Sequence, residues 1–288
     1  MVYSHRLLSL GAAAGLFLAA SSAAVLADGI EYDAKAMEAP KPAREFTYSF
    51  NIAGTSDYIF RGFSQTDRDP TLQGGMDMAY GSLYFGVWGS GLDFGDTGAP
   101  NFQEIAWGEI DIYGGLTRSW DTNTHLFGTI DFDFGVIYYA YPNARDSGAE
   151  LDYVEFKAGY SWPLWSFLIP NMTSGTTVFY SPDYTGETGS VWTVESTYSW
   201  KGHEIRGITP TISGLLGWQT GDSAAYSAIV NGDDNYYYWN AGLELAVEKI
   251  TFDFRYWDTN VSNAGGFCNG PLFQCDETFV FTVKVEVP

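Results

Sequence analysis

The 288-residue chain is short of positive charge, with 14 lysines and arginines against 35 acidic residues and a formal net charge of −21. A nucleic-acid-binding protein needs a basic face that neutralises phosphates, so this composition excludes that class. Histidine and cysteine are also scarce, at three and two residues. Beyond the N-terminal segment, no apolar run reaches the roughly 18 residues that a spanning helix requires. A helical membrane protein is therefore excluded as well.

Aromatic residues are abundant in contrast, at 17% of the chain, and 45% of all residues are apolar. Disordered chains are poor in aromatic residues, so we expect a folded protein. The mean hydropathy is nevertheless slightly negative, at −0.11. Such an average indicates an architecture in which apolar and polar residues alternate finely along the chain.

Residues 1–27 have the pattern of a secretory signal peptide. Arg6 belongs to a short basic start, an apolar run rich in Ala and Leu covers residues 7–20, and small residues precede the expected cleavage site. A transmembrane anchor is the alternative, but the run is too short and contains two glycines. We expect residues 28–45 to be a flexible periplasmic leader and residues 46–288 to be the folded domain.

The remaining sequence alternates with a period of two residues. Between residues 46 and 60 the even positions are mostly apolar and the odd positions mostly polar, and the alternation recurs over 125–138, 250–256 and 279–287. Successive strand side chains point to opposite faces, so each segment has one apolar and one polar face. We predict twelve strands, near residues 46–63, 71–80, 83–92, 103–117, 125–140, 150–162, 175–182, 190–200, 208–219, 236–247, 249–258 and 277–287.

The connections between these strands alternate between short and long. Gly81-Ser82 and Glu248 are short, whereas 92–102 and 258–276 are long. Short periplasmic turns on one rim and long external loops on the other are typical of outer-membrane barrels. The join from Trp162 to Ser174 breaks this alternation, because an apolar segment occupies the place of a short turn. Either this segment folds against the base of the barrel or one strand is misplaced.

A soluble β-sandwich also alternates, but it buries its apolar faces in a core. Aromatic residues at strand ends favour the membrane barrel, because aromatic girdles lie at both membrane interfaces. These residues are Tyr58, Phe60, Tyr138, Tyr139, Trp162, Tyr198, Trp200, Tyr237, Trp239, Tyr256 and Trp257. A closed barrel also satisfies every backbone hydrogen bond in lipid. We predict an all-β fold, a transmembrane antiparallel β-barrel of about twelve strands.

One motif resembles a known family. Residues 56–66 read SDYIFRGFSQT, Gln73-Gly74 follows, and residues 84–90 read YFGVWGS. This order resembles the opening signature of the TorF porin family, and residues 151–156 and 252–259 also resemble that family. The resemblance implies an outer-membrane β-barrel with channel function in a Gram-negative bacterium. It implies no particular substrate and no site residue.

If the apolar faces contact lipid, the polar faces point into the lumen. Strand parity then predicts a pore lining with ten acidic and four basic residues, and rings of carboxylates favour cation passage. These residues are Asp57, Arg61, Asp77, Glu109, Asp111, Asp131, Asp133, Glu155, Lys157, Glu195, Glu244, Asp253, Arg255 and Lys284. Alternatively, the charges pair, Arg61 with Asp57 or Arg255 with Asp253, and fill a narrow barrel.

Two pairs of carboxylates share a strand face, Asp131 with Asp133 and Glu109 with Asp111. Such pairs can bind a cation or share a proton, but no metal-loop spacing is present, so solvated lumen charge is the favoured interpretation. Divalent cations could also join acidic external loops to lipopolysaccharide, with simple solvation as the alternative. The loop acids are Asp67, Asp69, Asp93, Asp96, Asp222, Asp233 and Asp234.

His125 and His203 are the histidines that remain after the signal peptide. Neither has an obvious serine nucleophile or orienting partner, so we expect no enzyme activity and no cofactor. Cys268 and Cys275 flank six residues, and an oxidising compartment favours their disulfide, which would stiffen the last external loop. Two free thiols are the alternative. A metal site would need further ligands nearby.

The sequence thus predicts an outer-membrane channel for passive diffusion of small solutes, with a preference for cations. Its expected partners are outer-membrane lipid, lipopolysaccharide, and small solutes or cations, with no nucleic acid. A non-conducting structural or surface-interaction barrel is the first alternative, and a barrel enzyme is the second. The oligomeric state remains open.

Overall fold

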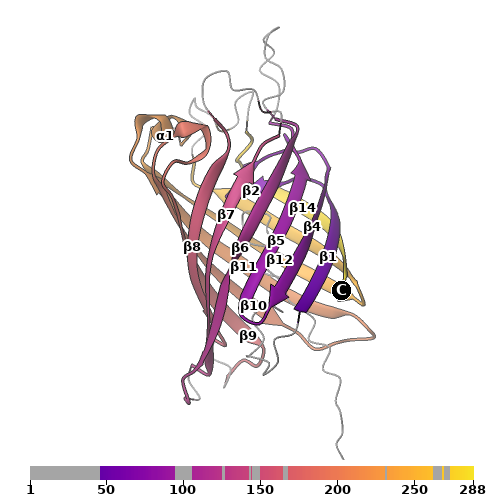
Figure 1. Ribbon diagram of the computed structural model, residues 1–288. Coiled ribbons are helices and arrows are strands. Elements are labelled where there is room, and N and C mark those ends of the chain that lie inside the picture. Colours follow the sequence, from indigo (N-terminus) through magenta and orange to yellow (C-terminus); the bar gives the residue numbers. More distant parts are fainter. Residues whose placement is uncertain are drawn as a thin grey trace, which may run out of the picture.

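The computed structural model describes residues 46–94, 106–124, 127–142, 144, 150–164, 168–230, 232–261, 268 and 273–288. Twelve of the described strands form one closed antiparallel barrel, which confirms the predicted fold class. Figure 1 shows the tilted strands of this barrel. The predicted signal peptide, the leader, His125 and Asp96 lie outside the described residues.

The wall strands follow one another in chain order, and β1 pairs with β14 to close the barrel. The short strands β2 and β3 pair only with each other, between β1 and β4. The elements are β1 (Phe46–Thr55), β2 (Ile59–Phe60), β3 (Phe63–Ser64), β4 (Thr71–Tyr80), β5 (Leu83–Gly91), β6 (Gly108–Asp121), β7 (Thr129–Ala140), β8 (Tyr153–Trp162), β9 (Met172–Ser181), η2 (Thr185–Glu187), β10 (Val191–Lys201), β11 (Thr209–Gly221), α1 (Ala224–Ile229), β12 (Asn235–Val247), β13 (Ile250–Thr259) and β14 (Thr278–Val287).

Most strand boundaries agree with the predictions to within a few residues. The predicted strand at 103–117 is shifted along the chain to 108–121. The join between β8 and β9 covers 163–171, at the same barrel end as the two-residue connections 81–82 and 248–249. We call this the short-turn end, and the opposite end, which carries α1, the long-loop end (Figure 1).

The first predicted strand, 46–63, is wrong in its second half. The wall strand β1 ends at Thr55, and β4 begins at Thr71. Residues 56–70 form a separate segment that contains the small β2–β3 hairpin. The alternation of apolar and polar residues continues past Thr55 because a hairpin alternates as a wall strand does.

The outer face of the barrel is apolar. Along β1, Phe46, Tyr48, Phe50 and Ile52 are each 44–58% exposed, whereas the alternate positions near Thr55 are buried. Exposed apolar side chains recur on other strands, as at Leu216 of β11. Hydrocarbon is the environment in which such a continuous apolar surface is stable, so this face fits a lipid bilayer. Among the described residues, no helix is long and apolar enough to span a membrane.

The barrel also has an aromatic core, which the sequence analysis did not predict. Tyr58, Tyr139 and Trp257, expected in the membrane girdles, are at most 4% exposed and face inward. Tyr139 stacks on Tyr153 with ring centroids 4.3 Å apart, and Tyr58 packs edge-on against Trp88. The aromatic surplus is therefore divided between a lipid-facing surface and an interior cluster.

Candidate pore and its inserted loop

Residues 56–70, here called the inserted loop, fold into the barrel instead of lying over its rim. The β2–β3 hairpin reverses at Arg61 and Gly62, whose φ values are 48° and 88°. Two left-handed residues in a row are typical of tight hairpin turns. A side chain at position 62 would collide with Thr259 of β13 and Tyr238 of β12. Glycine is therefore required where the turn touches the wall.

Asp57 organises the base of this loop. Its Oδ1 accepts hydrogen bonds from Ser64 Oγ at 2.7 Å and from Thr66 Oγ1 at 2.9 Å. Thr66 Oγ1 also accepts from the backbone N–H of Tyr58 at 3.1 Å. Burial raises the pKa of the Asp57 carboxyl above its ordinary value, although the hydrogen bonds from Ser64 and Thr66 oppose that shift. These contacts give structural roles to Asp57 and Tyr58 of the SDY part of the motif and to Ser64 and Thr66 of the SQT part.

Arg61 joins the tip of the loop to a distant wall strand. Its Nη1 and Nη2 donate to the two carboxylate oxygens of Glu155 at 2.8 and 2.7 Å, and both side chains are 1% exposed. Glu155 lies on β8, which is seven strands from β1 in one direction around the barrel and five in the other. The loop therefore crosses the lumen. Arg61 also lies over the rings of Phe60 and Phe179.

Further contacts hold the loop against other parts of the interior wall. Tyr236 Oη of β12 donates to the backbone oxygen of Arg61 at 3.0 Å, and the Phe63 ring packs edge-on against Tyr236. Phe60 packs against Tyr139 of β7. Aromatic and hydrogen-bonding contacts of this kind fix a loop more firmly than a surface loop is fixed.

Tyrosine hydroxyl groups donate to several inward carboxylates. Tyr113 donates to Asp77 at 2.5 Å and Tyr238 to Glu195 at 2.5 Å. The same arrangement joins Tyr84 to Asp133 at 2.8 Å and Tyr58 to Glu109 at 3.2 Å. These hydrogen bonds stabilise carboxylates that are partly or fully removed from water, without cancelling their charge.

The four inward basic residues all form ion pairs. Arg255 contacts Asp253 at 2.9 Å and Glu244 at 3.1 Å, as the pairing hypothesis proposed for Asp253. The other proposed pair is wrong, since Arg61 binds Glu155 across the barrel instead of Asp57. The remaining pairs are Lys157 with Asp133 at 2.5 Å and Lys284 with Glu286 at 3.3 Å.

Eleven of the fourteen predicted lining residues are less than 10% exposed, and Asp77, Asp131 and Asp133 are partly exposed. Asp131 accepts a hydrogen bond from Ser119 at 2.5 Å, and Asp111 is fully buried. Asp57 and Arg61 belong to the inserted loop and not to the wall. The structure gives these positions, and the role of the residues as a pore lining remains a prediction.

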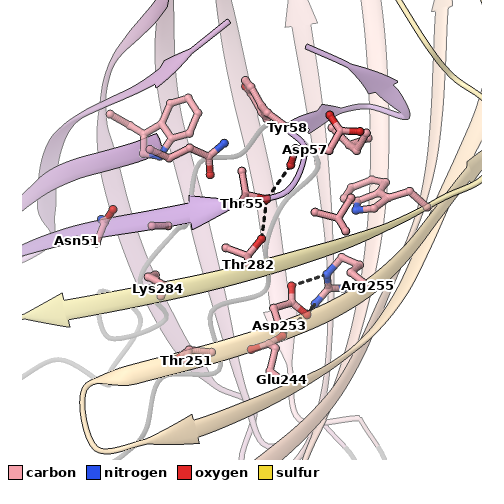
Figure 2. A pocket seen from close by; sticks show the side chains of 16 residues that line it. Asn51, Thr55, Asp57, Tyr58, Glu244, Thr251, Asp253, Arg255, Thr282 and Lys284 are labelled. Atoms are coloured by element: carbon pink, nitrogen blue, oxygen red, sulfur yellow. Dashed lines mark hydrogen bonds and ion pairs between the residues drawn. The ribbon is translucent and has the colours of Figure 1, made fainter. Parts of the chain in front are cut away.

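A cavity of about 80 Å³ remains beside the inserted loop. Figure 2 shows it between Asp57 and Tyr58 of the loop and the wall strands β1, β13 and β14. At the margin of the cavity, Thr282 Oγ1 of β14 donates a hydrogen bond to Thr55 Oγ1 of β1 at 2.9 Å. The loop contacts β7, β8 and β12, and the free space lies on the side of its own strand, β1. The cavity wall also includes Arg255 with its two acidic partners.

Several interior residues were missed by the sequence analysis. Tyr236, Tyr238 and Asn240 share the parity of Glu244 on β12, so the alternation that assigned Glu244 inward also applied to them. They were missed because the parity assignment was applied to charged residues alone, although a tyrosine hydroxyl or an amide also suits a polar interior. Asn240 accepts from Arg255 Nη1 at 2.8 Å.

Cys268 and Cys275 form a disulfide with their Cα atoms 5.4 Å apart, which confirms the predicted pairing. Both cysteines are 2% exposed. Within the described residues, no group of three or more His, Cys, Asp or Glu side chains could hold a metal ion. His203 is exposed in the turn between β10 and β11.

Residues 39–286 match a family model described as a bacterial protein of unknown function, Gcw_chp. The chain belongs to the Gcw_chp family. No curated protein matches the sequence.

Solved structures that resemble this Gcw_chp chain include the NanC porin, with 11% identity, coverage of 83% of this chain and 99% of that one, and a TM-score of 0.48. LpxR from Salmonella typhimurium has 12% identity, 83% and 99% coverage, and a TM-score of 0.41. The outer membrane channel DcaP of Acinetobacter baumannii has 7% identity, 87% and 99% coverage, and a TM-score of 0.39. Likeness at this level tells nothing about activity.

Proposed function

We propose that this Gcw_chp protein is an outer-membrane channel for passive diffusion of small solutes, with a preference for cations. The observation that carries the proposal is the contrast between an apolar outer face and an interior lined by charged side chains around a cavity. A barrel that served only as a membrane anchor would not require ten inward carboxylates, since burying charge is costly. The TorF resemblance of residues 56–66 supports the same function.

The location follows from the same features. A transmembrane barrel in a bacterial protein belongs in the outer membrane, and export through a signal peptide at residues 1–27 would bring it there. The Cys268–Cys275 disulfide fits an oxidising compartment. Outer-membrane lipid and lipopolysaccharide would then surround the apolar face, and no reaction or cofactor is part of the proposal.

The cation preference rests on the balance of interior charge. The four inward basic residues are all paired with carboxylates, and acidic residues outnumber them. A solute in the lumen therefore meets a net negative surface, which raises the local concentration of cations.

A second candidate function is a non-conducting barrel whose interior serves only stability. The inserted loop favours it, because Arg61 and its neighbours fill the lumen near the long-loop end. The two functions differ in conductance. Purified protein in a planar lipid bilayer should give discrete conductance steps and a reversal potential that indicates cation preference in a salt gradient. Absence of any steps would contradict the channel, and an anion-selective potential would contradict its selectivity.

A further inference from the structure

The inserted loop is held on two sides, and the second side contains the disulfide. On the lumen side, Arg61 binds Glu155. On the outer side, the backbone N–H of Ser64 donates to the carbonyl oxygen of Gln274 at 2.7 Å. Gln274 immediately precedes Cys275 in the sequence. The loop is thus enclosed between the barrel wall and the residues beside Cys275.

More contacts join these two segments. Gln274 Nε2 donates to Asp67 Oδ1 at 3.3 Å, and Arg68 forms an ion pair with Asp276. All of these partners in the last loop lie within one residue of Cys275. Cys275 itself is fixed by its bond to Cys268 and by Thr259 Oγ1 of β13, which donates to its carbonyl oxygen at 3.1 Å. We call residues 274–276 with Cys268 the clasp.

The backbone of the inserted loop is strained where the two sides hold it. Arg61, Asp67 and Arg68 have φ values of 48°, 49° and 67°, in the left-handed region that is unfavourable for residues with a side chain. Such conformations persist only where surrounding contacts impose them. Arg61 is held by the lumen contacts. The side chains of Asp67 and Arg68 contact the clasp, and the backbone N–H of Arg68 also donates to Ser64 Oγ at 3.0 Å. Loss of the clasp would therefore remove one of the two sets of contacts that hold these conformations.

We propose that the inserted loop is a strained plug and that the Cys268–Cys275 disulfide is the latch that keeps it in the lumen. When the disulfide is broken, the clasp loosens, the loop moves outward, and the conducting path through the barrel widens. The change in conductance rests on the proposed channel function, while the movement of the loop does not. In the reductive step a dithiol supplies two electrons and two protons, so that the protein gains two thiols and the dithiol becomes a disulfide.

Hydrogen–deuterium exchange of the folded protein in detergent tests the movement directly. Exchange in peptides covering residues 56–70 should rise by about tenfold or more in a C268S/C275S variant. Dithiothreitol added to the already folded wild-type protein should have the same effect, and alkylation with mass analysis confirms reduction of both sulfur atoms. This second arm avoids any requirement that the variant fold without its disulfide.

A matched control disturbs a different long loop. Ser223 Oγ accepts a hydrogen bond from the backbone N–H of Tyr226 at 2.9 Å and caps α1. The S223A variant should raise exchange within residues 222–234 and leave residues 56–70 unchanged. Equal exchange in residues 56–70 before and after complete reduction would overturn the latch.

Conductance measured on the same samples separates the two proposals. Increased exchange with increased conductance supports both of them. If reduction increases exchange in residues 56–70 but no sample conducts, the result supports the latch and contradicts the channel. If the wild-type protein conducts, but reduction changes neither its conductance nor its exchange, the result supports the channel and contradicts the latch.

Discussion

The guanidinium group of Arg61 and the carboxylate of Glu155 join the inserted loop to β8 through two buried hydrogen bonds of 2.8 and 2.7 Å. Removal of one partner leaves a buried charge without its counter-ion, which costs about 3–5 kcal/mol. We expect R61M and E155M each to lower the free energy of unfolding by that amount, and R61M/E155M to recover most of the loss. Urea unfolding in detergent measures all three variants, and simple additivity of the single variants would contradict direct coupling.

Asp57 provides a separate test of the inserted loop. In D57N the remaining carbonyl oxygen still accepts from Ser64 and Thr66, and the cost of a buried charge disappears. D57A removes the acceptor of both hydrogen bonds, which are worth about 1.5–3 kcal/mol each when the acceptor is charged. We expect D57N to keep nearly full stability and D57A to lose about 3–6 kcal/mol in urea unfolding. Equal losses in both variants would show that charge matters more than the hydrogen bonds.

Gly217 tests the close packing beneath Tyr238. A Cβ at Gly217 of β11 would overlap the Tyr238 ring, so G217A must displace the hydroxyl that donates to Glu195. We expect a loss of about 1–3 kcal/mol, as is usual for overpacked interiors. The matched control is G54A, because a Cβ there meets only Leu72 at an ordinary 3.8 Å. Unfolding measurements should separate the two variants, and similar stabilities would mean that the ring has room to move.

Asp131 and Asp133 should differ in their effect on selectivity. Asp131 is bound by the Ser119 hydroxyl, whereas Asp133 is the counter-ion of Lys157. We expect D131N to reduce cation preference, measured as a reversal potential, with little change in stability. D133N should reduce both quantities, because Lys157 loses its ion pair. A reversal potential that neither substitution moves would contradict the acidic-lumen mechanism.

The outer face predicts a position-dependent effect of arginine. Leu216 lies in the middle of β11 and is 59% exposed, whereas Ile205 is 65% exposed in the turn at the short-turn end. Arginine on the lipid face near the bilayer midplane costs about 2–4 kcal/mol. We expect L216R to reduce folding into lipid vesicles and I205R to fold as the parent does. The two variants would fold equally well if the face of β11 were exposed to water.

The wall strands could be predicted because each carries its own signal. Phe279 and Phe281 alternate with Thr278 and Thr282, and a one-residue shift would exchange the apolar and polar faces. The inserted loop could not be recognised in this way. Its hairpin continues the same alternation past Thr55, so parity alone does not distinguish wall from plug.

The partner of Arg61 could not be predicted either. Glu155 is 94 residues away in the sequence, and no local pattern connects a loop tip to the opposite wall. Parity placed both side chains inside but gave no pairing, so the nearby Asp57 was considered instead. Tyr238 was missed for a different reason, since only charged residues were assigned to the lumen and the hydroxyl that donates to Glu195 belongs to an aromatic residue.

The pairing of β1 with β14 has a consequence for biogenesis. Phe50 pairs with Val287, so the seam joins strands from opposite ends of the described barrel. Until they meet, the sheet has two open edges whose N–H and C=O groups hydrocarbon cannot satisfy. The nascent sheet must therefore remain in water, or have its edges covered by another protein's strands, until the seam closes. An unclosed sheet that meets a second copy would pair with it edge to edge, so aggregation competes directly with insertion.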